Sequence, residues 1–549
     1  MRALRTRPGG GAGFTDERRP TPSRGVAYGR HEARLSAEEP RCQETGVSEP
    51  TASAPVRPAA VLILAAGEGK RMRSATPKVL HTLCGRTMLG HVVAAARELA
   101  PERLVVVVGH GREQVSAMLA ETDAAALPVV QEVQHGTGHA VRIAMEAIAA
   151  QGAIDGTVLV TYGDTPLLTA ATLDALVTVH QETGNAVTVL TANVPDPTGY
   201  GRIVRRDGAV ERIVEQRDAS PQQAAIREVN SGVYAFDAKL LAQGLSRLTT
   251  ANAQGEEYLT DVLGILAGDG HRVGALTVAD HHEILGANDR AQLAQLRRIF
   301  NARLTGHWMR EGVTIVDPDT TWIDVQVALE PDVVLLPNTQ LCGATRIAVG
   351  AEVGPNCTLT DTVVGSGARV TNATTEGAVI GEAATVGPYT YLRPGTRLGR
   401  KAKAGGFVEM KNAQVGDGSK VPHLSYVGDA TIGEGCNIGA GTITANFDGV
   451  RKHHTRIGDH VFVGTDTVLI APVQVADGAF VAAGSAITQC VPAGSLAVAR
   501  GRQRNVEGWV ERTRPDTKAA RAAQAAQEAH AAAQSAEAGE PAQREADDA

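Results

Sequence analysis

The chain has 549 residues, enough for about three domains. Hydrophobic residues make up 43% and the mean hydropathy is −0.10, so the chain can bury a substantial core. Lysine and arginine number 53 against 60 aspartates and glutamates; a net charge of −7 argues against a general nucleic-acid binder, because no basic excess neutralises phosphates. Aromatic residues reach only 3% beside 60 glycines, which favours tightly stacked repeats over a sandwich or barrel.

Membrane insertion and secretion are not expected. No stretch approaches the ~18 consecutive apolar residues of a membrane span. Three arginines near the start of the chain have no apolar run behind them, so they do not form a secretory signal. The six cysteines are scattered without a C-x-x-C pair, which predicts free thiols in a cytoplasmic protein.

Residues 1–57 are predicted to be a disordered extension. They are rich in Arg, Pro, Gly, Ser, Thr and Glu and show no hydrophobic period. Order is expected to begin at residue 58, because residues 59–64 form an apolar run of strand length that ends in a glycine-rich turn.

Further apolar segments of strand length follow, separated by stretches of helix length. They are residues 105–108, 158–160 and 187–190. This alternation predicts an α/β, Rossmann-like domain over residues 58–290, with a parallel sheet covered by helices on both faces. Apolar residues near helical spacing then predict a linker helix over residues 291–311.

From about residue 325 the aliphatic residues recur every six positions. The positions in register are Leu335, Leu341, Ile347, Val353 and Leu359, then Val386, Leu392 and Leu398, then Ile432 and Ile438, and finally Ile457, Val463, Leu469, Val475, Val481 and Ile487. A period of six fits neither a helix nor a lone strand. It predicts a left-handed parallel β-helix of hexapeptide repeats over residues 312–512, in which three hexads close one coil. The alanine-rich residues 513–549 are predicted to be a disordered tail, with at most a transient helix.

The turn after the first strand carries a phosphate-binding pattern. Residues 64–72 read L-A-A-G-E-G-K-R-M, and small residues allow a nucleotide to approach free backbone N–H groups. Arg71 and Lys78 place two cations beside this turn, where phosphoryl transfer accumulates negative charge. The spacing matches neither a P-loop nor a dinucleotide motif. With P-K-V-L at residues 77–80, the string resembles the signature of sugar-1-phosphate nucleotidyltransferases.

That resemblance implies a nucleotide and sugar-phosphate site with Arg71 and Lys78 as catalytic residues. The implied binding residues are Leu64, Ala65, Ala66, Gly67, Lys78, Gln131, Gly136, Thr137, Tyr162, Gly163, Asp164, Gly201, Glu215, Asn230 and Asn288. Gln131 can pair with a uracil edge, while Glu215 and Asn230 suit the sugar hydroxyls and acetamido group. Asp164 follows a strand at its carboxyl end, where open α/β sheets bind ligands. The resemblance implies that Asp164 and Asn288 hold Mg²⁺ together with substrate phosphates and waters.

Segments rich in polar residues interrupt the hexapeptide repeats. A β-helix that served only as a scaffold would have small residues at these positions. Arg393 and Lys411 can hold a phosphate, and His423 can take a proton near neutral pH. Tyr426 and Asn437 complete this candidate acetyltransferase substrate site.

Together the two halves resemble one bacterial family, the bifunctional N-acetylglucosamine-1-phosphate uridyltransferases and glucosamine-1-phosphate acetyltransferases, over about residues 58–510. The resemblance implies a cytoplasmic, magnesium-dependent homotrimer that uses UTP, glucosamine-1-phosphate, N-acetylglucosamine-1-phosphate and acetyl-CoA. Its product, UDP-N-acetylglucosamine, supplies peptidoglycan and lipopolysaccharide precursors. The family's acetyl-CoA-binding positions fall on Ala440, Asn446, Phe447, Thr465, Ala483 and Arg500. The family commonly has Tyr at the position of Phe447, and often Ser at that of Thr465.

Two alternatives stay open from the sequence. One is a single-activity sugar-1-phosphate nucleotidyltransferase whose β-helix only oligomerises or binds effectors. The other is a non-catalytic regulatory subunit built from the same two folds. Asp164 and Asn288 beside two cations argue against a non-catalytic protein. His423 with its polar neighbours argues against the single activity.

Overall fold

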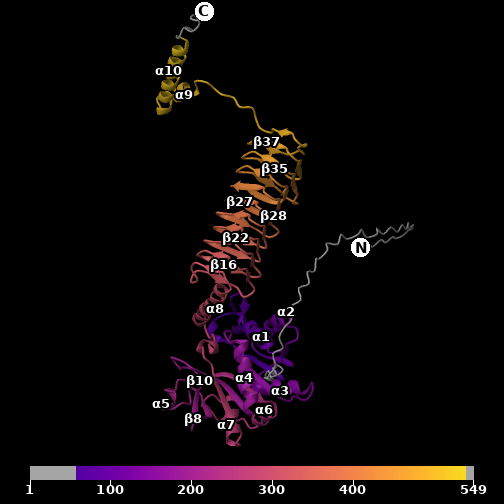
Figure 1. Ribbon diagram of the computed structural model, residues 1–549, viewed down its shortest axis with the longest axis vertical. Coiled ribbons are helices and arrows are strands. Elements are labelled where there is room, and N and C mark those ends of the chain that lie inside the picture. Colours follow the sequence, from indigo (N-terminus) through magenta and orange to yellow (C-terminus); the bar gives the residue numbers. More distant parts are fainter. Residues whose placement is uncertain (1–56, 539–549) are drawn as a thin grey trace, which may run out of the picture. The chain divides into compact units, whose positions relative to one another are not determined.

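The computed structural model describes residues 57–538. The predicted disorder of residues 1–56 and of residues 539–549 lies outside this range. Over the described part, Figure 1 shows an α/β domain drawn in indigo to magenta, followed by a stack of short strands drawn in pink to orange. No helix within residues 57–538 combines the length and apolar character needed to cross a bilayer.

The α/β domain is built on a sheet in the order β11-β7-β10-β6-β1-β4-β5. Its strands are β1 (Ala60–Ala65), β4 (Arg103–Val108), β5 (Leu127–Val130), β6 (Thr157–Tyr162), β7 (Val187–Asn193), β10 (Glu228–Asp237) and β11 (Val273–Thr277). β1 pairs in parallel with β4 and β6, as the alternating pattern predicts. The ligand-binding edge of such a sheet lies at the carboxyl ends of these strands.

Helices cover both faces of this sheet. The helices are α1 (Met88–Glu98), α2 (Arg112–Thr122), α3 (Thr137–Ala149), α4 (Ala170–Thr183), α6 (Ala238–Leu245) and α7 (Leu259–Gly268). Side chains alternate along β1, so Leu62 joins a core with α3, α6 and α7, whereas Ile63 joins a core with α1, α2 and α4. The predicted covering on both faces is therefore confirmed.

The sheet departs from the predicted parallel arrangement around β10. β10 runs antiparallel to both β6 and β7. The chain reaches it through the antiparallel hairpin of β8 (Arg202–Arg206) and β9 (Ala209–Val214) and the short α5 (Pro221–Ala224).

Helix α8 (Arg290–Arg310) occupies the segment predicted to link the two domains. Asn301 on this helix is buried, and its side-chain Nδ2 donates to the Thr321 carbonyl at 2.8 Å while Oδ1 accepts from the Ile323 N–H at 3.1 Å. The amide therefore satisfies both backbone groups at the start of β13 (Trp322–Ile323).

The hexapeptide prediction is confirmed by the coiled strands that follow. All the aliphatic positions in the six-residue register are buried within one continuous core. One sheet contains β12 (Thr314–Ile315), β15 (Val334–Leu335), β18 (Glu352–Val353), β21 (Arg369–Val370), β24 (Thr385–Val386), β27 (Lys403–Gly406), β29 (Lys420–His423), β31 (Asn437–Ile438), β34 (Phe462–Val463), β37 (Phe480–Val481) and β39 (Leu496–Ala497). A second curled sheet includes β25 (Thr390–Leu392), β28 (Glu409–Val415), β30 (Tyr426–Ile432), β32 (Ile443–Ala445) and β33 (Thr455–Ile457).

The C-terminal segment departs from the predicted disorder. The structure places α9 at Trp509–Thr513 and a long helix, α10, at Lys518–Ala538. Alanine is the strongest helix former, and Gln, Glu and Arg also favour helix, so local propensity accounts for α10. The alanine-rich composition thus favours helix over these residues, where the sequence analysis allowed a transient one.

Candidate functional site

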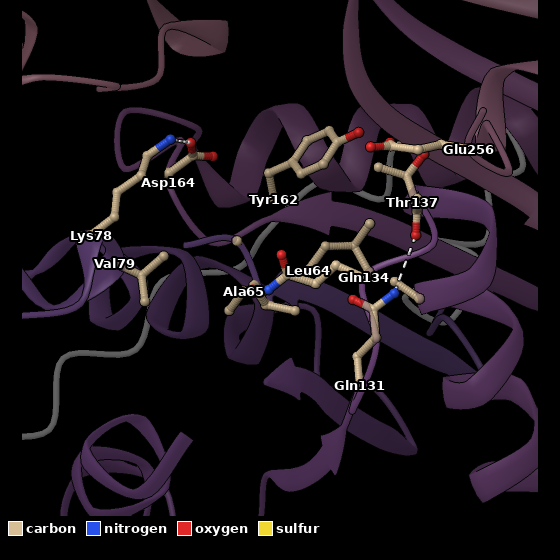
Figure 2. A pocket seen from close by; sticks show the side chains of 14 residues that line it. Leu64, Ala65, Lys78, Val79, Gln131, Gln134, Thr137, Tyr162, Asp164 and Glu256 are labelled. Carbon is tan, nitrogen blue, oxygen red and sulfur yellow. Dashed lines mark hydrogen bonds and ion pairs between the residues drawn. The ribbon is translucent and has the colours of Figure 1, made fainter. Parts of the chain in front are cut away.

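A cavity of about 260 Å³ opens at the carboxyl ends of β1 and β6 (Figure 2). Its lining includes most of the nucleotide-site residues expected from the sequence: Leu64, Ala65, Ala66, Gly67, Lys78, Gln131, Gly136, Thr137, Tyr162 and Asp164. The glycine turn comes from the end of β1, and Gln131 follows β5. Gly136 and Thr137 lie at the start of α3, where unpaired backbone N–H groups favour anions.

The two residues expected to hold a metal meet on one cation. The Lys78 ammonium forms an ion pair with the Asp164 carboxylate and donates a hydrogen bond of 2.9 Å to Oδ1 of Asn288. Figure 2 shows Lys78 reaching across to Asp164 at one end of the cavity. Two oxygen atoms from separate segments therefore converge on a single positive charge.

The expected sugar-binding residues form a cluster next to Tyr162. A Cβ placed on Gly201 would lie 3.4 Å from a carboxylate oxygen of Glu215 and 3.5 Å from Cβ of Asn230. Burial raises the pKa of Glu215. Burial, with the negative charges of Glu215 and Asp164, also raises the pKa of Tyr162 well above its usual range, so its hydroxyl stays a neutral donor.

Arg71 is placed differently from Lys78. It lies exposed in the 3-10 turn η1 (Lys70–Met72) and is not among the residues that line the cavity. The structure brings Lys78 to the expected phosphate position and leaves Arg71 at the rim of the glycine turn.

Two polar lining residues, Gln134 and Glu256, were missed by the sequence reasoning. Gln134 donates from Nε2 to the Ala66 carbonyl at 2.6 Å and so spans two walls of the cavity. Glu256 belongs to a loop that Glu257 anchors, because Arg142 on α3 holds both carboxylate oxygens of Glu257 at 2.8 and 2.9 Å. Gln134 lies within the stretch that signalled base binding, whereas no motif marked the Glu256 loop.

In the β-helix, three of the expected substrate residues share one face. On neighbouring turns of the β-helix, Tyr391 pairs with Glu409, and Glu409 pairs with Tyr426. Two residues after Tyr391 and Glu409, the same register places Arg393 beside Lys411. Arg393 also donates to Glu409 at 2.9 Å. Gly428 follows Lys411 in the register, and a Cβ there would lie 2.4 Å from the Tyr426 hydroxyl, so only glycine leaves room for this ring.

Lys452 is a further cation that the sequence reasoning did not single out. The close approach of its ammonium, together with the charge of Arg393, lowers the pKa of Lys411. Lys452 reaches this place because its backbone pairs with Phe447 in a short antiparallel bridge. Three positive groups thus gather at one point, which suits a phosphate.

His423 lies in line with residues expected to bind acetyl-CoA. Lys420 pairs with Asn437, Asn437 with Phe462 and Phe462 with Phe480. Each of these residues is followed, three positions later, by a residue of a second set: His423, Ala440, Thr465 and Ala483. The same register stacks this second set in a column along successive turns of the β-helix. Arg500 extends the column by donating to the Ala483 carbonyl at 3.0 Å. The His423 side chain is exposed, and across residues 57–538 its imidazole makes no hydrogen bond.

The remaining expected residues flank this column. Asn437 lies on β31 three residues before Ala440. Asn446 is buried and donates to Asp429 at 2.5 Å, whereas Phe447 exposes 59% of its surface. Beside His423, an apolar ladder of Tyr389, Phe407 and Leu424 is 61–62% exposed, with the two aromatic rings stacked at 5.1 Å.

Comparisons with known proteins agree with both halves. Residues 61–256 match a MobA-like NTP transferase domain, and residues 454–489 match a hexapeptide repeat of succinyl-transferase. Proteins named bifunctional protein GlmU from Streptomyces avermitilis and Streptomyces coelicolor are each 62% identical over 469 residues, covering 85% of this chain and 97% of the relative. The relative of the same name from Thermobifida fusca is 58% identical over 468 residues, again covering 85% and 97%.

Proposed function

Because the chain belongs to the GlmU family of bifunctional proteins, we propose that it makes UDP-N-acetylglucosamine in two steps. A hexapeptide-repeat acyltransferase domain and a nucleotidyltransferase domain are both present. The first transfers acetyl from acetyl-CoA to glucosamine-1-phosphate. The second transfers uridylyl from UTP to the resulting N-acetylglucosamine-1-phosphate. The convergence of Asp164 and Asn288 on Lys78, which lines the nucleotide cavity, carries this proposal.

In uridylyl transfer, a phosphate oxygen of the sugar phosphate attacks the α-phosphorus of UTP and pyrophosphate leaves. No covalent enzyme intermediate is needed, so the residues act by positioning and by charge neutralisation. The glycine turn and the start of α3 hold the nucleotide, while Glu215, Asn230 and Tyr162 bind the sugar. Lys78, supported by Arg71 at the rim, offsets the charge of the leaving pyrophosphate.

The same site suits Mg²⁺. The Asp164 and Asn288 side chains present oxygens to one cation, the Lys78 ammonium, and such hard oxygen donors are the ligands Mg²⁺ takes alongside phosphates and waters. When bound, Mg²⁺ would neutralise phosphate charge and favour attack at phosphorus.

In acetyl transfer, the amine of glucosamine-1-phosphate attacks the thioester carbon of acetyl-CoA, the C–S bond breaks so that coenzyme A leaves as its thiol, and the amine nitrogen loses a proton. His423 accepts this proton; its imidazole is exposed, and it stands at the start of the column formed by Ala440, Thr465 and Ala483. Arg393, Lys411 and Lys452 hold the sugar phosphate, and Tyr426 and Asn437 orient the sugar ring. Acetyl-CoA extends along the column toward Arg500, beside Asn446 and Phe447.

We further propose a homotrimer built on the β-helix, acting in the cytoplasm. The ladder of Tyr389, Phe407 and Leu424 supports this, because large apolar side chains exposed together beside the acetyl-transfer residues mark an interaction surface. Prismatic coils have three faces, and contacts between unlike faces close as a ring of three.

One assay tests both activities. Glucosamine-1-phosphate, acetyl-CoA, UTP and Mg²⁺ are supplied together and then omitted one at a time, with sugar products identified by mass spectrometry. Omission of acetyl-CoA should abolish UDP-N-acetylglucosamine, and adding N-acetylglucosamine-1-phosphate should restore it. Product formation from supplied N-acetylglucosamine-1-phosphate, with no acetyl transfer under any condition, would leave only the single-activity alternative.

A further inference from the structure

The side-chain amide of Gln131, which lines the nucleotide cavity, is fixed by two hydrogen-bond acceptors. Its side-chain Nε2 lies 3.2 Å from the Gly136 carbonyl and 3.0 Å from Nδ1 of His139. A carbonyl oxygen can only accept, so the amide must present its nitrogen to Gly136. Both N–H groups of the amide are then used, one by each neighbour.

The Gly136 carbonyl cannot move away from this contact. It also accepts the Ala140 N–H at 3.2 Å, at the first turn of α3. The segment before α3 is fixed against Glu257, whose N–H donates to the His135 carbonyl at 2.8 Å and whose carbonyl accepts from the Gly138 N–H at 2.8 Å. Gly136 has a φ of 110°, and a Cβ there would lie 2.4 Å from the Glu257 carbonyl oxygen. The first acceptor is therefore rigid.

The second acceptor requires a neutral imidazole with Nδ1 unprotonated. His139 is partly buried, and this burial, with the nearby charge of Arg142, lowers its pKa, although Glu257 and Glu146 oppose the shift and His135 adds to it. His139 does not line the cavity, so its ring serves Gln131 rather than a ligand. Nδ1 is thus an acceptor at neutral pH.

With its nitrogen occupied, the Gln131 amide has only its oxygen left for the cavity. Figure 2 shows this oxygen on the side of Leu64 and Ala65, and the nitrogen on the side of Thr137. Among the hydrogen bonds of residues 57–538, none uses this oxygen. A fixed acceptor complements a base that carries N–H at ring position 3, as uracil does. Cytosine has a lone pair there and would be repelled.

We infer that His139 is a positioning residue that sets the choice of nucleotide, by holding the Gln131 amide so that it accepts from uracil and rejects cytosine. This inference rests on the proposed uridylyl transfer and names the residue behind its base selectivity. His139 acts through Gln131 and touches neither substrate nor the reacting phosphates.

The test compares UTP with CTP as nucleotide donor for N-acetylglucosamine-1-phosphate, in the full-length protein with Mg²⁺. The wild type should favour UTP in kcat/KM by at least about 100-fold, because a pocket built to hydrogen-bond one group rejects its mismatch strongly. His139→Leu removes one of the two hydrogen bonds that hold the amide and should lower the UTP:CTP ratio by about three- to tenfold. His139→Asn, whose Oδ1 can replace Nδ1 as acceptor, should recover most of the ratio.

His135→Leu is the matched control, because the His135 ring packs against His139 at 5.3 Å but makes no hydrogen bond to Gln131. It should leave the ratio unchanged. Thermal unfolding of the same preparations, followed for the α/β domain, reports folding, and His139→Met is a second acceptor-free variant if His139→Leu does not fold. An unchanged UTP:CTP ratio, or an equal loss with both nucleotides, would overturn the inference. Failure of the wild type to use UTP at all would instead overturn the proposed uridylyl transfer.

Discussion

The Lys78 ammonium donates a hydrogen bond of 2.9 Å to Oδ1 of Asn288, across 210 residues of sequence. Lys78 belongs to the 3-10 turn η2 (Lys78–Leu80), whereas Asn288 immediately precedes the cap of α8. A cation that lines the nucleotide cavity is thus held in part by the segment that leads into the linker helix. Chemistry in the α/β domain depends on where this helix begins.

Replacing Asp164 should abolish most uridylyl transfer. Asp164→Ala removes the carboxylate that pairs with Lys78 and would hold Mg²⁺, so we expect a fall on the order of 10²-fold or more in kcat. Steady-state assays with N-acetylglucosamine-1-phosphate measure this, and acetyl transfer in the same sample is the control. Near-normal UDP-N-acetylglucosamine formation would refute the assignment of Asp164.

His423→Ala should separate the two reactions. Loss of a general base costs ~10²–10⁴-fold, so acetyl transfer should fall by this factor while uridylyl transfer stays intact in the other domain. The two half-reactions are assayed separately on one preparation, with its thermal stability checked. If His423 only packs between coils, both activities should fall modestly and together.

The apolar ladder beside His423 should be required for assembly. Phe407→Asp places a charge against Tyr389 and Leu424, and we expect dissociation of the trimer and loss of acetyl transfer, with uridylyl transfer retained. Light scattering coupled to size exclusion gives the mass. Val349→Asp, at an exposed valine outside the ladder, is the matched control. A monomer with full acetyltransferase activity would disprove the link.

The thiol of Cys84 should be inert in the folded protein. Burial, with the charge of Asp324, raises its pKa to about 12. An unfolded thiol ionises near its usual pKa of about 8.5, so between roughly pH 8.5 and 12 only the unfolded chain carries the reactive thiolate. Iodoacetamide at pH 9 should therefore label exposed Cys490 in the native protein and Cys84 only after denaturation. Peptide mapping by mass spectrometry detects alkylation at Cys84 and at Cys490. Labelling of Cys84 in the native protein would contradict its burial.

The β-helix could be predicted because its inward-facing aliphatic residues recur every six positions on turn after turn. Leu335 through Ile487 were identified from a six-residue period alone, and each is buried, since a coil offers a single inward position per face. The nucleotide cavity was also accessible, because Leu64 to Gly67 form a local string that binds phosphate through its backbone.

The features that escaped prediction depend on distant contacts. Glu256 reaches the cavity through the Arg142–Glu257 ion pair, and Lys452 joins Lys411 only because a loop folds back on Phe447. The antiparallel direction of β10 relative to β6 and β7 is not marked by its own residues. None of these features produces a repeating pattern or a short motif in the sequence.

The loop between β32 and β33, which carries Asn446, Phe447 and Lys452, interrupts the chain without disturbing the turns around it. Ala430 still pairs with Thr455 beyond the loop, and Ile443 still pairs with Val468. A corner of the coil can therefore gain or lose whole segments while the phase of the ladder is conserved. Length changes at this corner are therefore tolerated by the fold, whereas a single-residue insertion inside β33 would move the side chains that follow it in that strand to the opposite face.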